Sequence, residues 1–246
     1  MSFLERLKSA LSSREIYAIT ATVAVAVMVV AYMFPFPSTD TLCRYAPMAE
    51  AFASGNWVDA FHPRFAVGGS VVAGVFALLP GFDGFTACTV SASLAWALGV
   101  IPVFFIAARV FDRRTAWFAV VLYVLCPQPL IWALKGLREP FKMLGLLLMV
   151  DALLRVRDQT GTCRLALLEA CVAQTFLCLF KCDAVVLAAL TGLVFAVLDR
   201  FGKRTILLLA WCVAILQPMC LLVYQWTGYW LPTPHYALFL GKVFGG

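Results

Sequence analysis

The chain has 246 residues, of which 63% are hydrophobic and only 13% are charged, and its mean hydropathy is +0.92. Soluble globular domains carry about 25% charged residues, so this composition excludes them and indicates an integral membrane protein. The formal net charge of +6 does not indicate a nucleic-acid partner, because the basic residues form small clusters between apolar runs rather than one basic face.

Because a membrane-spanning helix needs about 20 apolar residues, a chain of this length can hold roughly six to eight spans and leaves no room for a separate soluble domain. We therefore predict an all-α integral membrane protein that forms a single membrane domain over residues 1–246. Membrane lipids are its expected surroundings.

The first crossing is predicted at residues 16–34, after the basic residues Arg6, Lys8 and Arg14. This run is too long for the core of a signal peptide and lacks a small-x-small cleavage site, so it is a retained span. Residues 35–84 then form a long extracytoplasmic loop with surface helices.

The loop opens with three N-cap residue types at 38–40 and reaches a helix-stop glycine at Gly55. Between them, apolar residues recur at helical spacing: Leu42, Tyr45, Ala49 and Phe52. The pattern predicts an amphipathic helix along the membrane surface. Pro47 within it predicts either a kink or a short first turn from Asp40 followed by a restart at the proline.

Further apolar runs occupy residues 65–79, 85–110, 116–134, 141–154, 165–180, 184–198 and 206–226. Lys and Arg near helix ends are retained on the cytoplasmic side. If residues 65–79 do not cross, 12 of the 19 Lys and Arg residues are cytoplasmic; if they do cross, only 8 are. We therefore predict seven crossings, with a cytoplasmic N-terminus, a re-entrant or surface segment at 65–79 and an extracytoplasmic tail at 227–246.

This topology collects polar residues on the extracytoplasmic face: Asp40, Arg44, Tyr45, His62, Arg64, Arg138, Glu139, Lys181 and Asp183. Each has a simpler explanation. Asp40 could cap a helix or pair with Arg44, and His62 could be a turn residue. Arg138 and Lys181 could anchor the chain at the lipid headgroups.

Other polar residues and the cysteines are expected to be structural. Asp151 and Glu169 lie near cytoplasmic helix ends, where Asp151 can pair with Arg155 one turn later. The nine cysteines include no CxxC pair, and most are predicted to be small core residues: Cys88, Cys126, Cys171, Cys178, Cys212 and Cys220.

Several short motifs resemble those of the membrane-embedded glycosyltransferases of the GT-C fold, which include protein mannosyltransferases and the aminoarabinose transferases of lipid A. The first-loop motifs are Asp40 with Arg44-Tyr45-Ala46, then Gly55-Asn56-Trp57 and Phe61-His62-Pro63. The later motifs are Ala107-Ala108-Arg109-Val110-Phe111 before Arg113-Arg114, then Arg138-Glu139 and Lys181-Cys182-Asp183.

The resemblance implies transfer of a sugar from a polyprenyl-phosphate carrier to an extracytoplasmic lipid, glycan or protein acceptor, in a bacterial inner or plasma membrane rather than the endoplasmic reticulum. Asp40 would be the catalytic base, and Lys181 and Arg138 would bind the donor phosphate. The remaining extracytoplasmic polar residues would contact substrate: Arg44, Tyr45, His62, Arg64, Glu139 and Asp183. Asp40 and His62 could hold a divalent metal ion, as in some relatives.

Two positions depart from the family pattern: Thr41 follows Asp40 where relatives have a second acid, and Arg64 follows Pro63 where they have a second proline. Two alternatives to an enzyme therefore stay open. One is a transporter or flippase of lipid-linked sugars, although we find no midplane charge and no clear internal repeat. The other is a non-catalytic scaffold or fragment of the same fold.

Overall fold

The computed structural model describes residues 3–61, 67–158, 164–180, 182–200 and 202–210, together with positions 212, 214, 221 and 225. Over these residues the chain is helical and contains no strand, which confirms the all-α prediction. His62, Arg64, Lys181 and the tail at 227–246 lie outside them, and so does most of the seventh predicted crossing.

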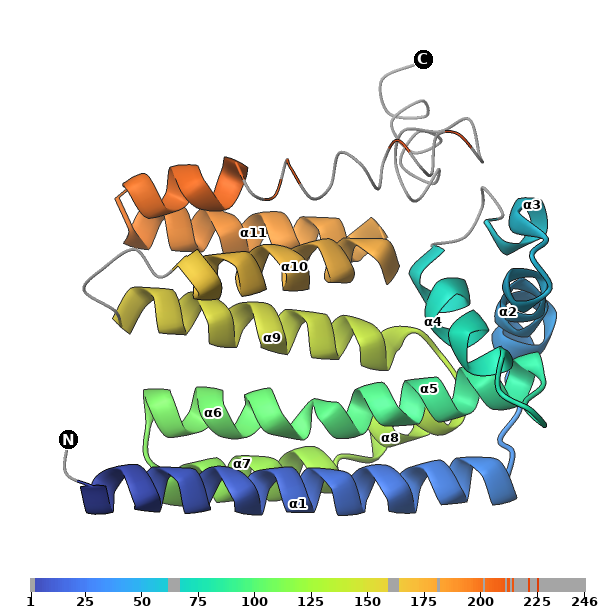
Figure 1. Cartoon of the computed structure of the whole chain (residues 1–246), viewed down its shortest axis with the longest axis horizontal. Coiled ribbons are helices and arrows are strands. Elements are labelled where there is room, and N and C mark those ends of the chain that lie inside the picture. Colours follow the sequence, from blue (N-terminus) through green and yellow to red (C-terminus); the bar gives the residue numbers. More distant parts are fainter. Residues whose placement is uncertain are drawn as a thin grey trace.

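The long helices lie side by side in one bundle (Figure 1). They are α1 (Phe3–Met33), α5 (Gly84–Leu98) continued by α6 (Val100–Val110), α7 (Arg113–Leu125), α9 (Glu139–Asp158), α10 (Arg164–Phe180) and α11 (Cys182–Leu198). Their directions alternate along the chain. We call the end with the α6–α7 turn and the last turn of α9 the basic end, and the end with residues 34–60 and the α8–α9 turn the loop end.

The loop end carries the short elements: the π-helical turn η1 (Thr41–Tyr45), α2 (Ala46–Ala53), α3 (Trp57–Ala60) and α4 (Val67–Ala77), with α8 (Pro127–Leu134) leading toward it. Pro47 lies in the first turn of α2, as predicted, but the backbone stays helical from η1 into α2, so the chain changes from a π-helical to an α-helical turn there without a break. The stop after α2 is also confirmed, since Gly55 takes a left-handed φ of 76°.

The predicted surface segment at 65–79 contains α4, a helix of 11 residues that packs on α2, α5 and α10. At 1.5 Å per residue it is about 16 Å long, well short of the roughly 30 Å hydrocarbon core. This length agrees with the prediction that the segment does not cross.

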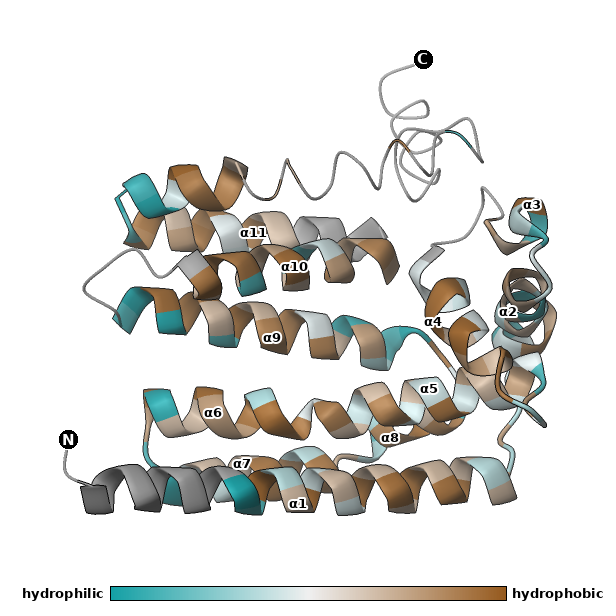
Figure 2. Cartoon of the chain, in the orientation of Figure 1, coloured by the Kyte–Doolittle hydropathy of each residue, from teal (hydrophilic) through white to brown (hydrophobic). Residues whose placement is uncertain are grey.

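Two helical stretches are long and apolar enough to cross a membrane, Arg14–Met33 with 20 residues and Gly84–Val110 with 27. The pair α7 and α8 makes a third if it counts as one bent span. Figure 2 shows hydrophobic residues along the bundle and hydrophilic ones toward helix ends. The outer face of α7 is apolar and open, since Phe118, Leu122 and Leu125 are each at least 70% exposed. These features support membrane association, while the seven crossings stay a prediction.

The predicted run at 85–110 forms two consecutive helices, α5 and α6, with a break at Gly99 between them. Pro102 has no backbone N–H to donate back to the preceding turn, which accounts for a break at this point. The Tyr123 hydroxyl of α7 lies against the break and donates to the Trp96 carbonyl at 2.9 Å. This bond joins α7 to the last turn of α5.

The run at 116–134 is bent by 50° between α7 and α8. Cys126 takes an extended conformation at the junction because Pro127 follows it. The prediction that Cys126 is a core residue is wrong, since the bend leaves it exposed. The same prediction is confirmed for four other cysteines, which are buried: Cys88, Cys171, Cys178 and Cys212.

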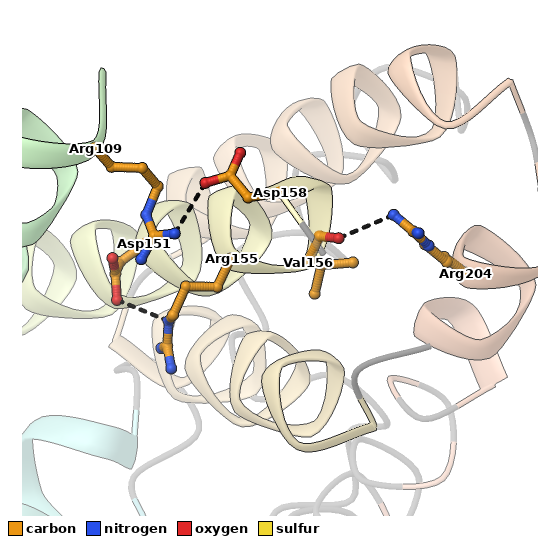
Figure 3. A network of polar contacts seen from close by, with 6 residues as sticks. All are labelled: Arg109, Asp151, Arg155, Val156, Asp158 and Arg204. Carbon is orange, nitrogen blue, oxygen red and sulfur yellow. Dashed lines mark hydrogen bonds and ion pairs between the residues drawn. The ribbon is translucent and has the colours of Figure 1, made fainter. Parts of the chain in front are cut away.

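Polar contacts join the helices at the basic end (Figure 3). Arg109 of α6 pairs with Asp158 of α9 at 2.9 Å, and the Arg204 guanidinium donates to the Val156 carbonyl at 2.9 Å. Arg155 pairs with Asp151 at 3.1 Å, as predicted, and also with Glu169 of α10. The basic end is therefore tied together by side chains from α6, α9, α10 and residue 204.

Candidate functional site

Thr41 fixes the first-loop turn η1 to the bundle. Its side chain is fully buried, and its hydroxyl donates to the Lys135 carbonyl in the α8–α9 turn. The Ser38 hydroxyl lies 2.7 Å from the Thr41 hydroxyl oxygen. The bond between Thr41 and Lys135 joins two segments that are 94 residues apart in the sequence. Thr41 thus acts as a structural anchor where the glycosyltransferase pattern has a second acid.

Replacing Thr41 by valine should lower the free energy of unfolding by about 1 to 3 kcal/mol, because the partly buried Lys135 carbonyl would lose its donor. Aspartate should be worse, since a carboxylate at this buried position would face a carbonyl oxygen. Thermal unfolding of the purified variants measures both effects. Thr39→Val is the matched control on an exposed neighbour, and an equal loss in the control would contradict the anchoring role.

Asp40 precedes the anchor and points its carboxylate to the surface. It forms an ion pair with Arg44 at 2.8 Å, with about half of each side chain exposed. It makes no capping hydrogen bond to the turn that it precedes. The structure therefore favours pairing with Arg44 over capping as the structural role of Asp40, and leaves the carboxylate open to solvent.

Tyr45 is close enough to this pair for both charges to act on its hydroxyl, and it is only 6% exposed. The Arg138 guanidinium lies over its ring, 5.6 Å from the centroid, which is within range of a cation–π contact. Burial raises the pKa of the Tyr45 hydroxyl, and the nearby charges of Arg138, Asp40, Glu139 and Arg44 also act on it. The hydroxyl is thus neutral at physiological pH and can donate a hydrogen bond.

The structure therefore brings five of the predicted site residues together, Tyr45 and four charged residues around it. Two segments supply them: η1 and the residue before it, and the α8–α9 turn with the first residue of α9. We call them the loop-end cluster: Asp40, Arg44, Tyr45, Arg138 and Glu139.

The α8–α9 turn can approach η1 closely because residue 136 is glycine. Gly136 has a φ of 64°, and a Cβ atom there would lie about 3.0 Å from the Thr41 methyl group. A side chain at this position would strain the backbone and push the turn away from η1. Arg138 follows two residues later, so its place over Tyr45 depends on this glycine.

An apolar groove of about 710 Å³ lies between α5 on one side and α9 with α10 on the other. Along α9 it extends from Phe141 to Arg155, or about 21 Å at 1.5 Å per residue. Most of its lining is aliphatic or aromatic, including Leu94, Leu98, Leu144, Leu148, Val172 and Phe176. Its length and lining suit a hydrocarbon chain.

The loop-end cluster lies at one end of this groove. A small cavity below Tyr45 and Arg138 shares two lining residues with the groove, Ser91 and Phe141. Phe141 also stacks on Phe180, the last residue of α10, with ring centroids 4.8 Å apart. The opposite end of the groove is lined by the ion-paired Arg155 and Glu169.

The side chains of four predicted site residues lie outside the described part of the chain. His62, Arg64 and Lys181 lie outside the described residues, and only the backbone of Asp183, in α11, lies within them. Over the described part of the chain, no three His, Cys, Asp or Glu side chains gather into a metal site. Asp40 is already paired with Arg44, so the described residues do not fit a metal ion. No step of the reaction is therefore attributed to a metal ion.

Sequence reasoning missed two polar residues next to the cluster. Glu50 of α2 accepts a hydrogen bond at 2.9 Å from the Gly84 N–H, at the start of α5. Ser91 lines both cavities while donating to the Cys88 carbonyl. Glu50 is a polar residue within the predicted first-loop helix and could have been suspected, whereas Ser91 lies in an apolar run and carries no local signal.

The fold and the cluster define a class, a helical protein with membrane-compatible helices and charged residues above an apolar groove. Comparison with protein-family models, curated proteins and solved structures returned no match.

Proposed function

We propose that the protein is a membrane glycosyltransferase that takes its sugar from a polyprenyl-phosphate carrier. The observation that carries the proposal is the position of the loop-end cluster, with two arginines and two carboxylates, at the end of an apolar groove about 21 Å long. A lipid-linked sugar has the same layout, a hydrocarbon chain that ends in an anionic phosphate and a polar sugar.

In this mechanism the acceptor hydroxyl attacks the anomeric carbon, whose bond to the phosphate oxygen breaks. Asp40 takes the hydroxyl proton, and the departing polyprenyl phosphate takes the bonding electrons. Arg138 and Lys181 stabilise the negative charge that develops on the leaving oxygen. Electrostatic stabilisation of this kind commonly makes a large contribution to the rate enhancement. Arg44, Tyr45, Glu139, His62, Arg64 and Asp183 contact the sugar or the acceptor.

Arg138→Ala should weaken binding of a polyprenyl-phosphate sugar about tenfold or more, because a charge-assisted hydrogen bond contributes roughly 1.5 to 3 kcal/mol. Equilibrium binding to the purified protein in lipid nanodiscs measures the change. Lys135→Ala is the matched control, since its ammonium group lies over the Phe36 ring in the same α8–α9 region. Equal affinities in wild type and Arg138→Ala would leave only the headgroup-anchor explanation.

We further propose that the loop end is extracytoplasmic. The basic end holds several clustered cations, among them Arg109, Arg113, Arg114, Arg155 and Arg157, as the cytoplasmic side of a membrane protein does. Cys43 at the loop end is exposed and provides a native probe.

In intact cells, a membrane-impermeant maleimide should label Cys43 from outside. A cysteine placed at Arg114 in a Cys43→Ser, Cys126→Ser background should react only after the membranes are opened. The residue is exposed, and the change keeps the Arg113–Glu15 ion pair. Labelling of the residue-114 cysteine in intact cells, together with no labelling of Cys43 in intact cells that carry the wild-type chain, would show the opposite topology.

One observation favours a second function, binding of a lipid-linked sugar without catalysis. Thr41 stands where the family has a second acid, and it is buried and bonded to the Lys135 carbonyl rather than facing a substrate. A non-catalytic chain would bind the donor and lose affinity on Arg138→Ala, but would release no polyprenyl phosphate.

A further inference from the structure

Two buried thiols lie in contact between α10 and the last described helix, which comprises residues 203–210 and position 212. The sulfur atoms of Cys171 and Cys212 are 3.6 Å apart, and the two residues are 0% and 7% exposed. They are separated by 41 positions in the sequence, so the contact joins two different helices. They lie in a core that also includes Ala188 and Phe195 of α11 and Met149 of α9.

The polar atoms around the pair hold both sulfurs in place. Cys171 Sγ donates to the Leu208 carbonyl at 3.4 Å, and Cys212 Sγ donates to Gln174 Oε1 at 3.0 Å. The Gln174 amide nitrogen in turn donates to the Ala188 carbonyl of α11 at 3.5 Å. Each thiol therefore has an oxygen acceptor as well as a neighbouring sulfur.

We infer that Cys171 and Cys212 form a redox-active dithiol that closes to a disulfide and locks the last described helix onto α10. A disulfide has a sulfur–sulfur distance of about 2.05 Å, so closure needs an approach of about 1.5 Å. This inference is independent of the proposed sugar transfer.

The oxidant belongs to the class of membrane-permeant two-electron acceptors, because the pair is buried in a protein with membrane-compatible helices. Diamide, an azo compound, represents that class. The sulfur of one cysteine first adds to an azo nitrogen. The sulfur of the second cysteine then attacks the first sulfur, so that the S–N bond breaks and the S–S bond forms. The two thiols lose two protons and two electrons, and the azo group takes them up to become a hydrazine.

The disulfide would attach the last described helix to α10, which forms one wall of the groove. Val172 and Ala173, next to Cys171, line the groove on the opposite side of α10. The helix beyond residue 202 contacts the core through Thr205, Leu208 and Cys212, whereas Ile206 and Leu209 are each at least 60% exposed. A helix packed through one face gains much from a covalent link to its neighbour.

The test uses the purified full chain in nanodiscs, fully reduced, freed of reductant and treated with diamide. After alkylation of the remaining thiols under denaturing conditions, peptide mass spectrometry should find a peptide linking Cys171 and Cys212, lighter by about 2 Da than the two free peptides. The oxidised protein should also unfold at a higher temperature than the reduced protein.

Cys171→Ser should abolish the link and the stabilisation while keeping the fold, because serine can still donate to the Leu208 carbonyl. Cys178→Ser, a buried cysteine on the same helix, should leave both unchanged. The inference is overturned if diamide links other cysteines but leaves 171 and 212 reduced, or if the link forms without raising the unfolding temperature.

Discussion

Asp40→Asn should lower the rate of sugar transfer by about 100-fold or more and leave donor binding intact. General base catalysis typically contributes a factor of 10² to 10⁴, and asparagine keeps the shape of aspartate without a basic oxygen. The expected signature is a lower kcat with little change in the donor Kd. Transfer rates and donor affinities of the reconstituted variant measure the two quantities separately.

The structure makes this substitution informative, because losing the ion pair with Arg44, which is the simpler role of Asp40, should reduce stability only slightly. Its ion pair with Arg44 is about half exposed, and pairs of this kind contribute roughly 0 to 1 kcal/mol to stability. If the pair were the whole role of Asp40, the variant would fold and transfer sugar at a near-normal rate. A rate effect of 100-fold therefore cannot come from the lost ion pair alone.

Asp59→Asn is the matched control. Asp59 lies in the same loop, is exposed, and accepts a hydrogen bond from Asn56 at 2.6 Å, but it is not among the loop-end cluster. Its neutralisation should not change the rate. If Asp40→Asn also transferred sugar normally, Glu139 or Asp183 would be the next candidate base, or the protein would be a binding module.

Arg155→Ala should lower the free energy of unfolding by about 2 to 4 kcal/mol, the largest stability effect that we expect from one side chain. Removing this guanidinium leaves two carboxylates, of Asp151 and Glu169, without their common cation. The Asp151 side chain is only 10% exposed, and a carboxylate stranded in such a place is costly. Partial exposure of Glu169 keeps the loss below that of a fully buried pair.

Arg113→Ala provides the comparison at the same end of the bundle. Arg113 pairs with Glu15 at 2.9 Å, but both side chains are more than half exposed, so its loss should cost at most about 1 kcal/mol. Unfolding midpoints of the two variants in the same detergent measure the difference. Equal midpoints would show that burial of Asp151 does not govern the stability of the basic end.

Features set by neighbouring residues could be predicted from the sequence. Pro47 marks the first turn of α2 and Gly55 marks its end, and both positions are confirmed. The Asp151–Arg155 pair follows from helical spacing alone. The exposure of Cys126 was missed because apolar periodicity continues across Pro127, although this proline bends the helix.

The loop-end cluster was predicted only as a set of residues on one face of the membrane. Its geometry depends on contacts between distant segments, such as Thr41 with Lys135 and Tyr45 with Arg138. Neither contact has a local pattern, because each depends on how η1 and the α8–α9 turn pack. The groove likewise arises from the spacing of α5, α9 and α10, whose facing residues resemble those of any packed helix.

The central claim is the transfer of a sugar from a polyprenyl-phosphate carrier, and the most direct test measures release of the carrier. Wild-type protein reconstituted in liposomes would be mixed with a panel of radiolabelled polyprenyl-phosphate hexoses and pentoses, together with membrane extract as the source of acceptor. The account predicts that at least one donor yields free polyprenyl phosphate and labelled acceptor, and that Asp40→Asn suppresses both products. Tight donor binding without release from any member of the panel would contradict it.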